Sequence, residues 1–550
     1  MGSFADFASA LERVRGTAGK NEKVRILSEY LSGLDADDAE RAARFATGRA
    51  SQKGSADETQ TGYSTIIDVI QEMTGMASRD ITRVYVKYGD LGRVVEEVIS
   101  GKKETTLFHE DLTLADVAET FDGMTQSKGK GSTSAKRAYL KSALLRANPI
   151  EAKYLVKILT KEMRIGLVEG LVVEAIASAY GLETDAVREA NLLLGDVGLL
   201  ARQAKSGRLS GVRLELMRPT NFMLAEPMQT AEEIASYYQK EVYAEVKYDG
   251  VRAQLHKKGR EVRIFSRRLE EITDSFPEVA AAAMKFEGDM LVDGEIVPFR
   301  DGKPLAFQML QRRLRRIEDF QEAQENAPVR YFVFDILMLG AVELYKRPLR
   351  ERRENLGKVV EGTGFAFADM TLARTAREIT KLFRSSRSRG YEGLVVKDPD
   401  SQYTPGRRGK SWVKLKEELD TLDVVIVGAE LGHGKRAGRL SDYTFAVRDG
   451  SDFKVIGKAY SGLTDAEIEE MAVKIKAATL HDDGYYRTVS PELVIEVAFD
   501  SIQKSGRHDS GFALRFPRIK SIRTDKTPEQ ADTLERARKL YESQKVRSEQ

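Results

Sequence analysis

The pattern of hydrophobic and polar positions changes twice along the chain. From residue 4 to about residue 210, apolar residues recur every three or four positions, as in Asn21–Leu34, Thr65–Met73 and Glu151–Ile165. This spacing is that of an amphipathic α-helix, and short breaks of Gly, Ser and Asp separate the repeats. We therefore predict that residues 1–215 form an all-α domain.

Beyond Pro219 the apolar positions begin to alternate with polar ones, which is typical of β-strands. Glu241–Gln254 and Arg260–Arg267 both alternate, and the Lys-Lys-Gly sequence ending at Gly259 predicts a hairpin turn between them. The same criteria predict three more strands and two helices: Met290–Pro298, Val329–Leu339, Gly393–Lys397, Pro304–Glu325 and Arg350–Val360. Strands mixed with helices in this way predict an α+β domain over residues 216–418.

The last segment, residues 419–550, has short strands with one helical stretch, Thr464–Ala478, among them. Several short strands with one inserted helix are typical of a small Greek-key β-barrel of the OB type. The predicted strands are Asp423–Glu430, Tyr443–Arg448, Phe453–Tyr460 and Leu493–Ile502. The tail, Thr527–Lys545, has the pattern of one charged helix.

Composition narrows the classes of function. A chain of 550 residues has room for about three domains. Lys and Arg number 87 against 85 Asp and Glu, so any surface for nucleic acid must be a local one. The absence of cysteine excludes disulfides, cysteine nucleophiles and thiolate zinc sites. Neither a secretory signal nor a long apolar stretch is evident, so we expect a cytoplasmic protein without a membrane segment.

One lysine stands out as a candidate nucleophile. Lys247 ends a predicted strand, directly before the turn pair Asp249-Gly250, where glycine lets a ligand approach the backbone. A lysine amine attacks phosphorus once it is deprotonated, and the planar guanidinium of Arg252 suits phosphate or ribose oxygens. Taken alone, the same short motif is also typical of an ordinary hairpin with a solvated lysine.

Further groups of charged residues follow Lys247 in a fixed order, mostly at predicted strand ends. Each group alone fits a structural role, as a turn, a core strand or a solvated strand edge. Together they place lysines, arginines and acids at the ends of several strands, which suits the binding of a nucleoside triphosphate. The groups are Phe265–Arg268, Leu291–Ile296, Tyr331–Asp335, Glu392–Lys397, Trp412–Lys416 and Arg515–Arg518.

This series resembles the motifs of the covalent nucleotidyltransferases, and the closest match is to archaeal and eukaryotic replicative ATP-dependent DNA ligases. The matching sequences are KYDGVR, FSRR, LVDGEI, YFVFD, EGLVVK, WVKLK and LRFPR. Lys130–Ser134 and Glu151–Tyr180 also resemble the helical DNA-binding domain of these ligases. The resemblance implies three domains: a helical DNA-binding domain, an adenylation domain and an OB-fold domain.

The resemblance also implies a role for individual residues. Lys247 would form the bond to AMP, Glu245 would read the adenine amino group, and Phe334 would stack on adenine. The expected ribose and phosphate contacts are Arg252, Arg267, Glu295, Arg408, Lys414 and Lys416. Glu295 and Glu392 are the expected metal ligands, and Arg515 and Arg518 would orient pyrophosphate. Expected DNA contacts are Lys128, Lys130, Ser132 and Arg164. The arginines at 312, 313, 315 and 316 are another option, and a solvated helix face is the alternative for them.

The implied reaction is the sealing of 5′-phosphate/3′-hydroxyl nicks in duplex DNA, in replication, repair and recombination. ATP is the expected substrate, Mg²⁺ the expected metal and nicked double-stranded DNA the expected partner, for a protein that acts as a monomer. The region of Leu107 and Phe108 lies where related ligases carry a peptide for a sliding clamp. It lacks the usual initial Gln and the pair of final aromatics, so an apolar pair packed on the core is the alternative.

Three other functions share part of this pattern. An mRNA capping guanylyltransferase or RNA ligase would share the lysine motif, but it would not explain some 200 helical residues before that motif. A DNA-binding scaffold with a vestigial catalytic domain would have no need for intact Lys247, Glu295, Lys414 and Arg515. An NAD-dependent ligase carries a cysteine zinc site, and this chain has no cysteine.

Overall fold

A computed structural model describes most of the chain, and its contacts divide the chain into two compact units. The first unit consists of residues 1–66 and 105–417, and the second of residues 67–104 and 418–550. No helix in the described part has both the length and the apolar character that a membrane span requires. The described residues are 2–52, 62–100, 111–127, 129, 131–305, 307–314, 320–406, 408–416, 420–432, 436 and 438–549.

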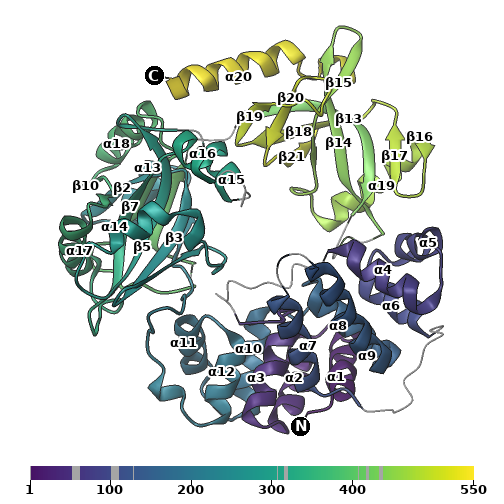
Figure 1. Cartoon of the computed structure of the whole chain (residues 1–550). Helices are drawn as coiled ribbons and strands as arrows, with labels where there is room; N and C mark the ends of the chain where they lie inside the picture. The colour runs from purple at the N-terminus through teal and green to yellow at the C-terminus, as the bar shows by residue number, and fades with distance from the viewer. Residues whose placement is uncertain are drawn as a thin grey trace. The chain divides into compact units, whose positions relative to one another are not determined.

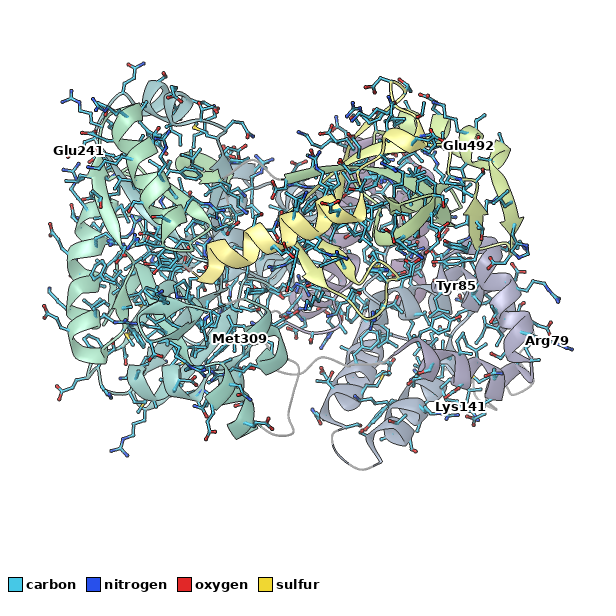
Figure 2. The ribbon with its side chains drawn as sticks, turned by 90° about the horizontal axis from the view of Figure 1, so that it is seen from above. Arg79, Tyr85, Lys141, Glu241, Met309 and Glu492 are labelled. Atoms are coloured by element: carbon cyan, nitrogen blue, oxygen red, sulfur yellow. The ribbon has the colours of Figure 1, made fainter. Side chains whose placement is uncertain are left out.

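The amino-terminal third is helical, as its periodicity predicts (Figure 1). Side-chain caps mark several helix starts, such as the reciprocal bonds between Asn148 and Glu151 that begin α9. The helices of the first unit are α1 (Phe4–Gly16), α2 (Lys20–Ser32), α3 (Ala36–Ala46), α7 (Leu114–Gln126), α8 (Ser132–Arg146), α9 (Pro149–Leu159), α10 (Glu169–Ala179), α11 (Thr184–Leu194) and α12 (Val197–Lys205). The division between the units falls within α4 (Tyr63–Thr74). Helices α5 (Ser78–Tyr88, which carries Arg79 and Tyr85 in Figure 2) and α6 (Leu91–Ile99) belong to the second unit.

The rest of the first unit contains two β-sheets whose strands are mostly antiparallel. The first, which we call the lysine sheet because its strand β2 ends at Lys247, has the strand order β1-β12-β11-β2-β10. The apolar side chains on one of its faces pack against α13 and α18. Its elements are β1 (Leu224–Pro227), β2 (Val242–Lys247), β10 (Met370–Ala373), β11 (Gly393–Lys397), β12 (Arg408–Lys416), α13 (Ala231–Tyr238) and α18 (Ala376–Ser388). Glu241, labelled in Figure 2, directly precedes β2.

The second sheet of this unit, the arginine sheet, has the main strand order β4-β3-β5-β7-β8, with β6 beside β5 and β9 beside β7. Helices α14, α15 and α17 cover one of its faces, and Met309 of α15 is labelled in Figure 2. Its elements are β3 (Val251–Lys258), β4 (Glu261–Ser266), β5 (Met290–Arg300), β6 (Lys303–Pro304), β7 (Val329–Leu339), β8 (Val342–Glu343), β9 (Ala366–Phe367), α14 (Pro277–Ala283), α15 (Gln308–Leu314), α16 (Phe320–Asn326) and α17 (Leu349–Thr363).

The carboxy-terminal part of the second unit is a β-structure around one main apolar core, with a small second apolar cluster beside β13 and β18. Strand β13 is central, because it pairs with β14, β17 and β18, and α19 is inserted between β15 and β16. This arrangement agrees with the expected small barrel with one inserted helix. Its elements are β13 (Asp420–Leu431), β14 (Leu440–Asp449), β15 (Asp452–Ala459), α19 (Asp465–Ala477), β16 (Thr479–Asp482), β17 (Tyr486–Val489), β18 (Val494–Phe499), β19 (Ser501–Lys504), β20 (Phe512–Arg515), β21 (Arg518–Ile522) and α20 (Leu534–Glu549).

Several predicted elements differ from the observed ones at their ends. The stretch Glu241–Gln254 is two strands, because the chain turns at Asp249-Gly250 between β2 and β3. The helix predicted over Glu151–Ile165 ends at Leu159, since Lys161 and Arg164 both have positive φ. The predicted tail helix is shorter at its start: α20 begins at Leu534, after a 3₁₀ turn over Pro528–Gln530.

A buried histidine lies in the arginine sheet beneath the linker from the helical domain. His256 on β3 is fully buried, and its Nδ1 accepts a hydrogen bond of 3.2 Å from the backbone N–H of Met217. Its Nε2 has no hydrogen-bond partner among the described residues. Burial, and secondarily Arg263, lower the pKa of His256 from 6.5 to about 3. The histidine therefore stays neutral in the fold at pH values where the unfolded chain binds a proton.

We predict that His256 makes the free energy of unfolding fall as pH decreases from about 6.5 to about 3. Its folded pKa is lowered, so its contribution is complete above pH 6.5 and is lost through that window, by at most about 1.4 kcal/mol per pH unit. The measurement is urea unfolding followed by the fluorescence of Trp412, the single tryptophan of the chain. His256→Gln should show a shallower dependence, and a dependence equal to that of the wild type would contradict this assignment.

Candidate active site

The polar faces of the two sheets of the first unit carry most of the residues predicted to bind the nucleotide. On the lysine sheet, the face opposite α13 and α18 carries Lys247. On the arginine sheet, the face that carries Arg252, Glu295 and Phe332 is opposite the helix-covered core. Aromatic residues of both sheets and of the segments that join their strands pack together in one core cluster. The sequence thus folds so that each sheet has one apolar face and one reactive face.

Strand register explains how residues far apart in sequence come level with one another. Lys416 of β12, Gly393 of β11 and Lys247 of β2 are directly paired, so they form one row on the same face of the lysine sheet. The next row on that face consists of Lys414, Val395 and Glu245, and the third of Trp412, Lys397 and Tyr243. Four lysines of three neighbouring strands therefore share one face: Lys247, Lys397, Lys414 and Lys416.

The middle position of the first row has to be glycine. Gly393 has a φ of +151°, and a Cβ there would overlap with the carbonyl oxygen of Leu415. Gly250, just after the nucleophile strand, is also restricted, because a Cβ there would overlap with the carbonyl oxygen of Ile296. Both glycines allow backbone approaches that no side chain permits.

Glu392 joins the two lysines of the first row. Its carboxylate forms ion pairs with Lys247 through one oxygen and with Lys416 through the other. Its backbone N–H donates a 3.0 Å hydrogen bond to the carbonyl oxygen of Lys247, which fixes the end of β2. All three side chains are part-exposed, so a substrate can reach them.

Arg252 is held by a buried acid on the neighbouring strand. Its Nη2 and Nε donate to the carboxylate of Asp293 at 2.7 and 3.2 Å, and Asp293 also accepts from Tyr403 Oη at 2.7 Å. The guanidinium lies 5.3 Å from the centre of the Phe334 ring. A bidentate pair of this kind sets the orientation of the guanidinium before any ligand binds.

Glu295 is the second acid near the candidate nucleophile. Burial raises its pKa to about 7, and the charges of Lys247 and Arg252 oppose this rise. Among the described residues, no group of three or more His, Asp or Glu side chains is arranged to hold a metal ion. Mg²⁺ bound with nucleotides is commonly held by one or two carboxylates together with phosphate oxygens.

Glu245 and Phe334 lie in the third part of this site, next to two further cations. The Glu245 carboxylate accepts from Lys397 Nζ at 2.6 Å and from Arg353 Nη1 at 2.9 Å. Lys397 Nζ also lies 4.3 Å from the centre of the Phe334 ring. Burial lowers the pKa of Lys397, while Glu245 opposes this effect.

Other predicted nucleotide contacts lie at the edges of this region. Lys414 is half-buried in β12, between Lys416 and Trp412 on the same face. Arg267 is exposed in the turn after β4. Arg408 begins β12, and its side chain lies outside the described part of the structure.

The remaining predicted contacts lie away from the two sheets. Arg515 ends β20 and Arg518 begins β21, with Phe516 between them at a φ of +51°. Ser132 begins α8, and Arg164 forms a 2.6 Å ion pair with Glu162. Lys128, Lys130, Leu107, Phe108, Arg315 and Arg316 lie outside the described residues, as does the side chain of Arg312.

One optional DNA contact is excluded by burial. Arg313 is 1% exposed and donates to the carbonyl oxygens of Ser275 and Ala327, at 2.8 and 3.1 Å. It also forms an ion pair with Glu278. Its guanidinium therefore fastens α15 to α14 and to the segments before α14 and β7, and it is not available to contact a phosphate.

Sequence reasoning missed two buried arginines of α17, of which Arg353 contacts the site residue Glu245 and Arg352 does not. Arg352 and Arg353 occupy positions on α17 that continue the apolar series Leu349, Leu356 and Val359. Arginines inside an apolar helical stripe indicate buried ion pairs, and this signal was available in the sequence. Arg352 indeed pairs with Asp335 at 2.7 Å, and both side chains are fully buried.

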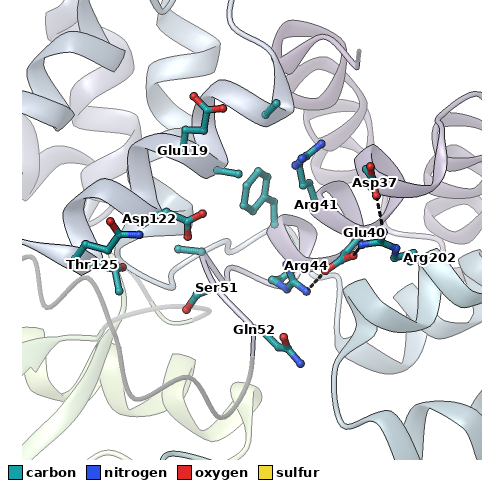
Figure 3. Close-up of a pocket in the computed structure, with 15 residues that line it drawn as sticks. Asp37, Glu40, Arg41, Arg44, Ser51, Gln52, Glu119, Asp122, Thr125 and Arg202 are labelled. Carbon is teal, nitrogen blue, oxygen red and sulfur yellow. Dashed lines mark hydrogen bonds and ion pairs between the residues drawn. The ribbon is translucent and has the colours of Figure 1, made fainter. Parts of the chain in front are cut away.

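A separate cleft of about 460 Å³ lies in the helical domain, lined mainly by α3 and α7 (Figure 3). Its arginines are already paired with acids: Arg44 with Glu40 at 2.6 Å, and Arg202 with Asp37 at 3.1 Å. Such neutralised pairs leave little positive charge for a phosphate. The cleft therefore does not compete with the two sheets as the nucleotide site.

Comparison with known families gives one consistent result over most of the chain. Residues 3–177 match the model described as "DNA ligase N terminus", and residues 222–416 match the "ATP dependent DNA ligase domain". Residues 436–526 match the "ATP dependent DNA ligase C terminal region". The matched segments follow one another in the order of the helical, two-sheet and barrel regions.

Three curated relatives are similar along nearly their whole length. A "Probable DNA ligase" of Koribacter versatilis is 44% identical, covering 98% of this chain and 96% of the relative. A "DNA ligase" of Methanothrix thermoacetophila is 36% identical over the full length of both chains, and one of Archaeoglobus fulgidus is 35% identical over 98% and 99%. A solved structure titled "Pmar-Lig_PreS3" has a TM-score of 0.61 at 17% identity, covering 94% of this chain and 99% of that one, which supports the fold alone.

We predict that Gly393→Ala abolishes nucleotide transfer and destabilises the first unit by about 1–3 kcal/mol, because its Cβ overlaps with Leu415 and must push β11 and β12 apart. The control is Gly357→Ala on α17, where a Cβ meets no atom within 4 Å and alanine favours the helix. Urea unfolding and labelling with α-labelled nucleotide measure both effects. A fully active Gly393→Ala variant would show that the row does not require glycine.

Proposed function

Because the chain belongs to the family of ATP-dependent DNA ligases, we propose that Lys247 is the nucleophile that carries adenylate from ATP to nicked DNA. The observation that carries this proposal is the position of Lys247 at the end of β2, level with Lys416 and in contact with Glu392. It is a part-exposed amine in a cluster of charged groups, next to glycines that allow a close approach of substrate.

The reaction consists of three phosphoryl transfers. The deprotonated amine of Lys247 attacks the α-phosphorus of ATP, a P–N bond forms, and the bond to the departing pyrophosphate breaks. An oxygen of the 5′-phosphate at the nick then attacks the adenylate phosphorus and releases the lysine. Finally the 3′-hydroxyl attacks the activated 5′-phosphate, the phosphodiester forms and AMP leaves. Each step depends on in-line positioning and on neutralising charge more than on proton transfer.

The other residues of the two sheets provide the binding contacts in this proposal. Phe334 stacks on the adenine and Glu245 accepts from its amino group, while Arg252, Arg267 and Glu295 contact ribose and phosphate. Arg408, Lys414 and Lys416 hold the phosphates. The support is the shared face of Lys414 and Lys416, and the fixed orientation that Asp293 gives to Arg252.

Glu295 and Glu392 are proposed as the ligands of Mg²⁺, and their surroundings fit a hard cation. Both carboxylates lie near Lys247, where the phosphates of ATP would provide the remaining oxygen ligands. When bound, the metal neutralises charge that develops on the phosphate oxygens. The protein supplies the two carboxylates and the flanking lysines that orient the phosphates.

Nicked double-stranded DNA is the second substrate, and a nick is recognised by backbone and shape because it has no defined sequence. We propose that the helical domain (residues 1–215) contacts this backbone through Lys130, Ser132 and Arg164. The adenylation domain (residues 216–418) performs the chemistry, and Arg515 and Arg518 of the OB-fold domain (residues 419–550) orient pyrophosphate. We also propose that the protein acts as a monomer in the cytoplasm and binds a sliding clamp near Leu107 and Phe108.

The family assignment decides among the alternatives that the sequence left open. A capping guanylyltransferase or an RNA ligase is not favoured, because all three matched models describe DNA ligases. An NAD-dependent ligase is not favoured either, because the matched catalytic and C-terminal models are those of ATP-dependent enzymes.

We predict that Lys247→Ala abolishes both self-adenylation and nick sealing while nicked DNA is still bound. The fold should survive, because Glu392 keeps its ion pair with Lys416 when Lys247 is removed. The measurement is transfer of label from α-labelled ATP to protein with Mg²⁺, followed by mapping of the labelled residue. Label retained by Lys247→Ala would reject Lys247 as the nucleophile, and GMP transferred from GTP in place of AMP would reject the ligase reaction.

We also predict that a variant that begins at Arg218 keeps some self-adenylation but seals nicks far more slowly. The two-sheet region retains its strands in this variant, whereas the proposed backbone contacts of the helical domain are lost. Sealing rates at saturating and limiting concentrations of nicked DNA measure the effect. Sealing as fast as that of the full chain at limiting DNA would refute a DNA-binding role of the first domain.

A further inference from the structure

The carboxylate of Glu245 is buried between two cations. Glu245 is 2% exposed, and it accepts from Lys397, which is 1% exposed, and from Arg353, which is 8% exposed. Glu245 and Lys247 lie on the same face of β2, two residues apart. The pair of cations therefore fixes a side chain that neighbours the nucleophile in the strand.

Arg353 connects Glu245 to the aromatic part of the site. Besides its bond to Glu245, its guanidinium donates to the carbonyl oxygens of Phe334 and Ala368, at 3.3 and 3.1 Å. The guanidinium also lies 4.2 Å from the centre of the Phe367 ring. One side chain from α17 thus ties together β2, β7 and the segment after β9.

Lys397 closes the other side of the cluster. Its ammonium lies 4.2 Å from the centre of the Trp412 ring, in addition to its contacts with Phe334 and Glu245. Two buried N–H groups of this cluster, Arg353 Nε and Trp412 Nε1, have no hydrogen-bond partner among the described residues. Buried polar atoms without partners are uncommon and fit a pocket that is completed by a polar ligand.

We propose that Arg353 is a positioning residue that holds Glu245 in the orientation needed to select adenine. This inference rests on the proposed function of the site, in which Glu245 accepts from the adenine amino group. A carboxylate has about four lone-pair sites, and each oxygen of Glu245 uses one of them for a cation, so others stay available for an amino group. Without Arg353, the flexible glutamate side chain can rotate away from the base.

The selection is against purines that carry a carbonyl oxygen at the position of the amino group. Adenine presents a donor to the carboxylate, whereas hypoxanthine and guanine present an acceptor there, which a carboxylate repels. Discrimination by a buried, fixed polar group is much larger than discrimination by shape alone. Arg353 therefore affects which base is accepted, without contacting the reacting phosphorus.

The experiment compares ATP with ITP as substrates for self-adenylation and self-inosinylation of the full-length protein. The quantity measured is the ratio of kcat/KM for the two nucleotides. The wild type should prefer ATP strongly, and Arg353→Gln should lower this preference at least tenfold, mainly through KM for ATP. Arg353→Lys keeps the charge but not the fork of donors, so its preference should lie between the other two.

Arg352→Gln is the matched control, because Arg352 is the preceding residue on α17 and is also buried in an ion pair, with Asp335. It does not contact Glu245 in the structure, so its ATP-to-ITP ratio should equal that of the wild type even if its stability decreases. Equal ratios for wild type, Arg353→Gln and Arg353→Lys would overturn the proposal. If Arg353→Gln does not fold, Arg353→Lys decides, and a wild-type ratio in that variant overturns the proposal equally.

The outcomes separate this inference from the proposed function. A wild-type protein that takes no label from either nucleotide contradicts the function of Lys247. A protein labelled at Lys247 whose ATP-to-ITP ratio does not depend on Arg353 leaves that function intact and rejects only the positioning role. An equal loss of preference in the Arg352 control would assign the effect to general destabilisation and would also reject the positioning role.

Discussion

The antiparallel register of β2, β11 and β12 places Lys247 and Lys416 at the same level, on either side of Gly393. This register is a stringent constraint, because a shift of one residue in any of the three strands would turn its reactive side chains to the apolar face. The apolar residues that pack on α13 and α18 fix it. The same hydrophobic packing that stabilises the lysine sheet therefore determines the positions of its lysine side chains.

Charge neutralisation is the second principle of the two-sheet region. Arg252 is paired with Asp293, Arg352 with Asp335, and Glu245 with both Arg353 and Lys397. Buried ions are tolerated in a fold when partners and hydrogen bonds compensate for the loss of water. These pairs hold their side chains in one orientation, and such preorganisation lowers the cost of binding a substrate.

The sequence predicted those strands and motifs that depend on local patterns of residues. Val329–Leu339 and Gly393–Lys397 were predicted with their observed ends, because apolar runs bounded by polar residues are local signals. The contacts of Arg353 with Glu245, and of Asp293 with Tyr403, were not predictable, since each joins residues more than 100 positions apart. The family resemblance proposed roles for individual residues, and the pairing of strands explains how Lys247, Lys414 and Lys416 come to share one face.

The ion-paired group of Lys247, Lys416 and Glu392 has a further consequence for the order of events. In the free protein this group carries a net charge of +1, which attracts the phosphates of ATP. Under the proposed chemistry, adenylation makes the nitrogen of Lys247 neutral and adds a phosphoryl group, so the local charge reverses to about −1. The adenylated group therefore no longer attracts a second triphosphate. The anionic 5′-phosphate of the DNA must instead be attracted by cations elsewhere in the chain. The charge of this group therefore differs between the enzyme that has yet to react with ATP and the adenylated enzyme.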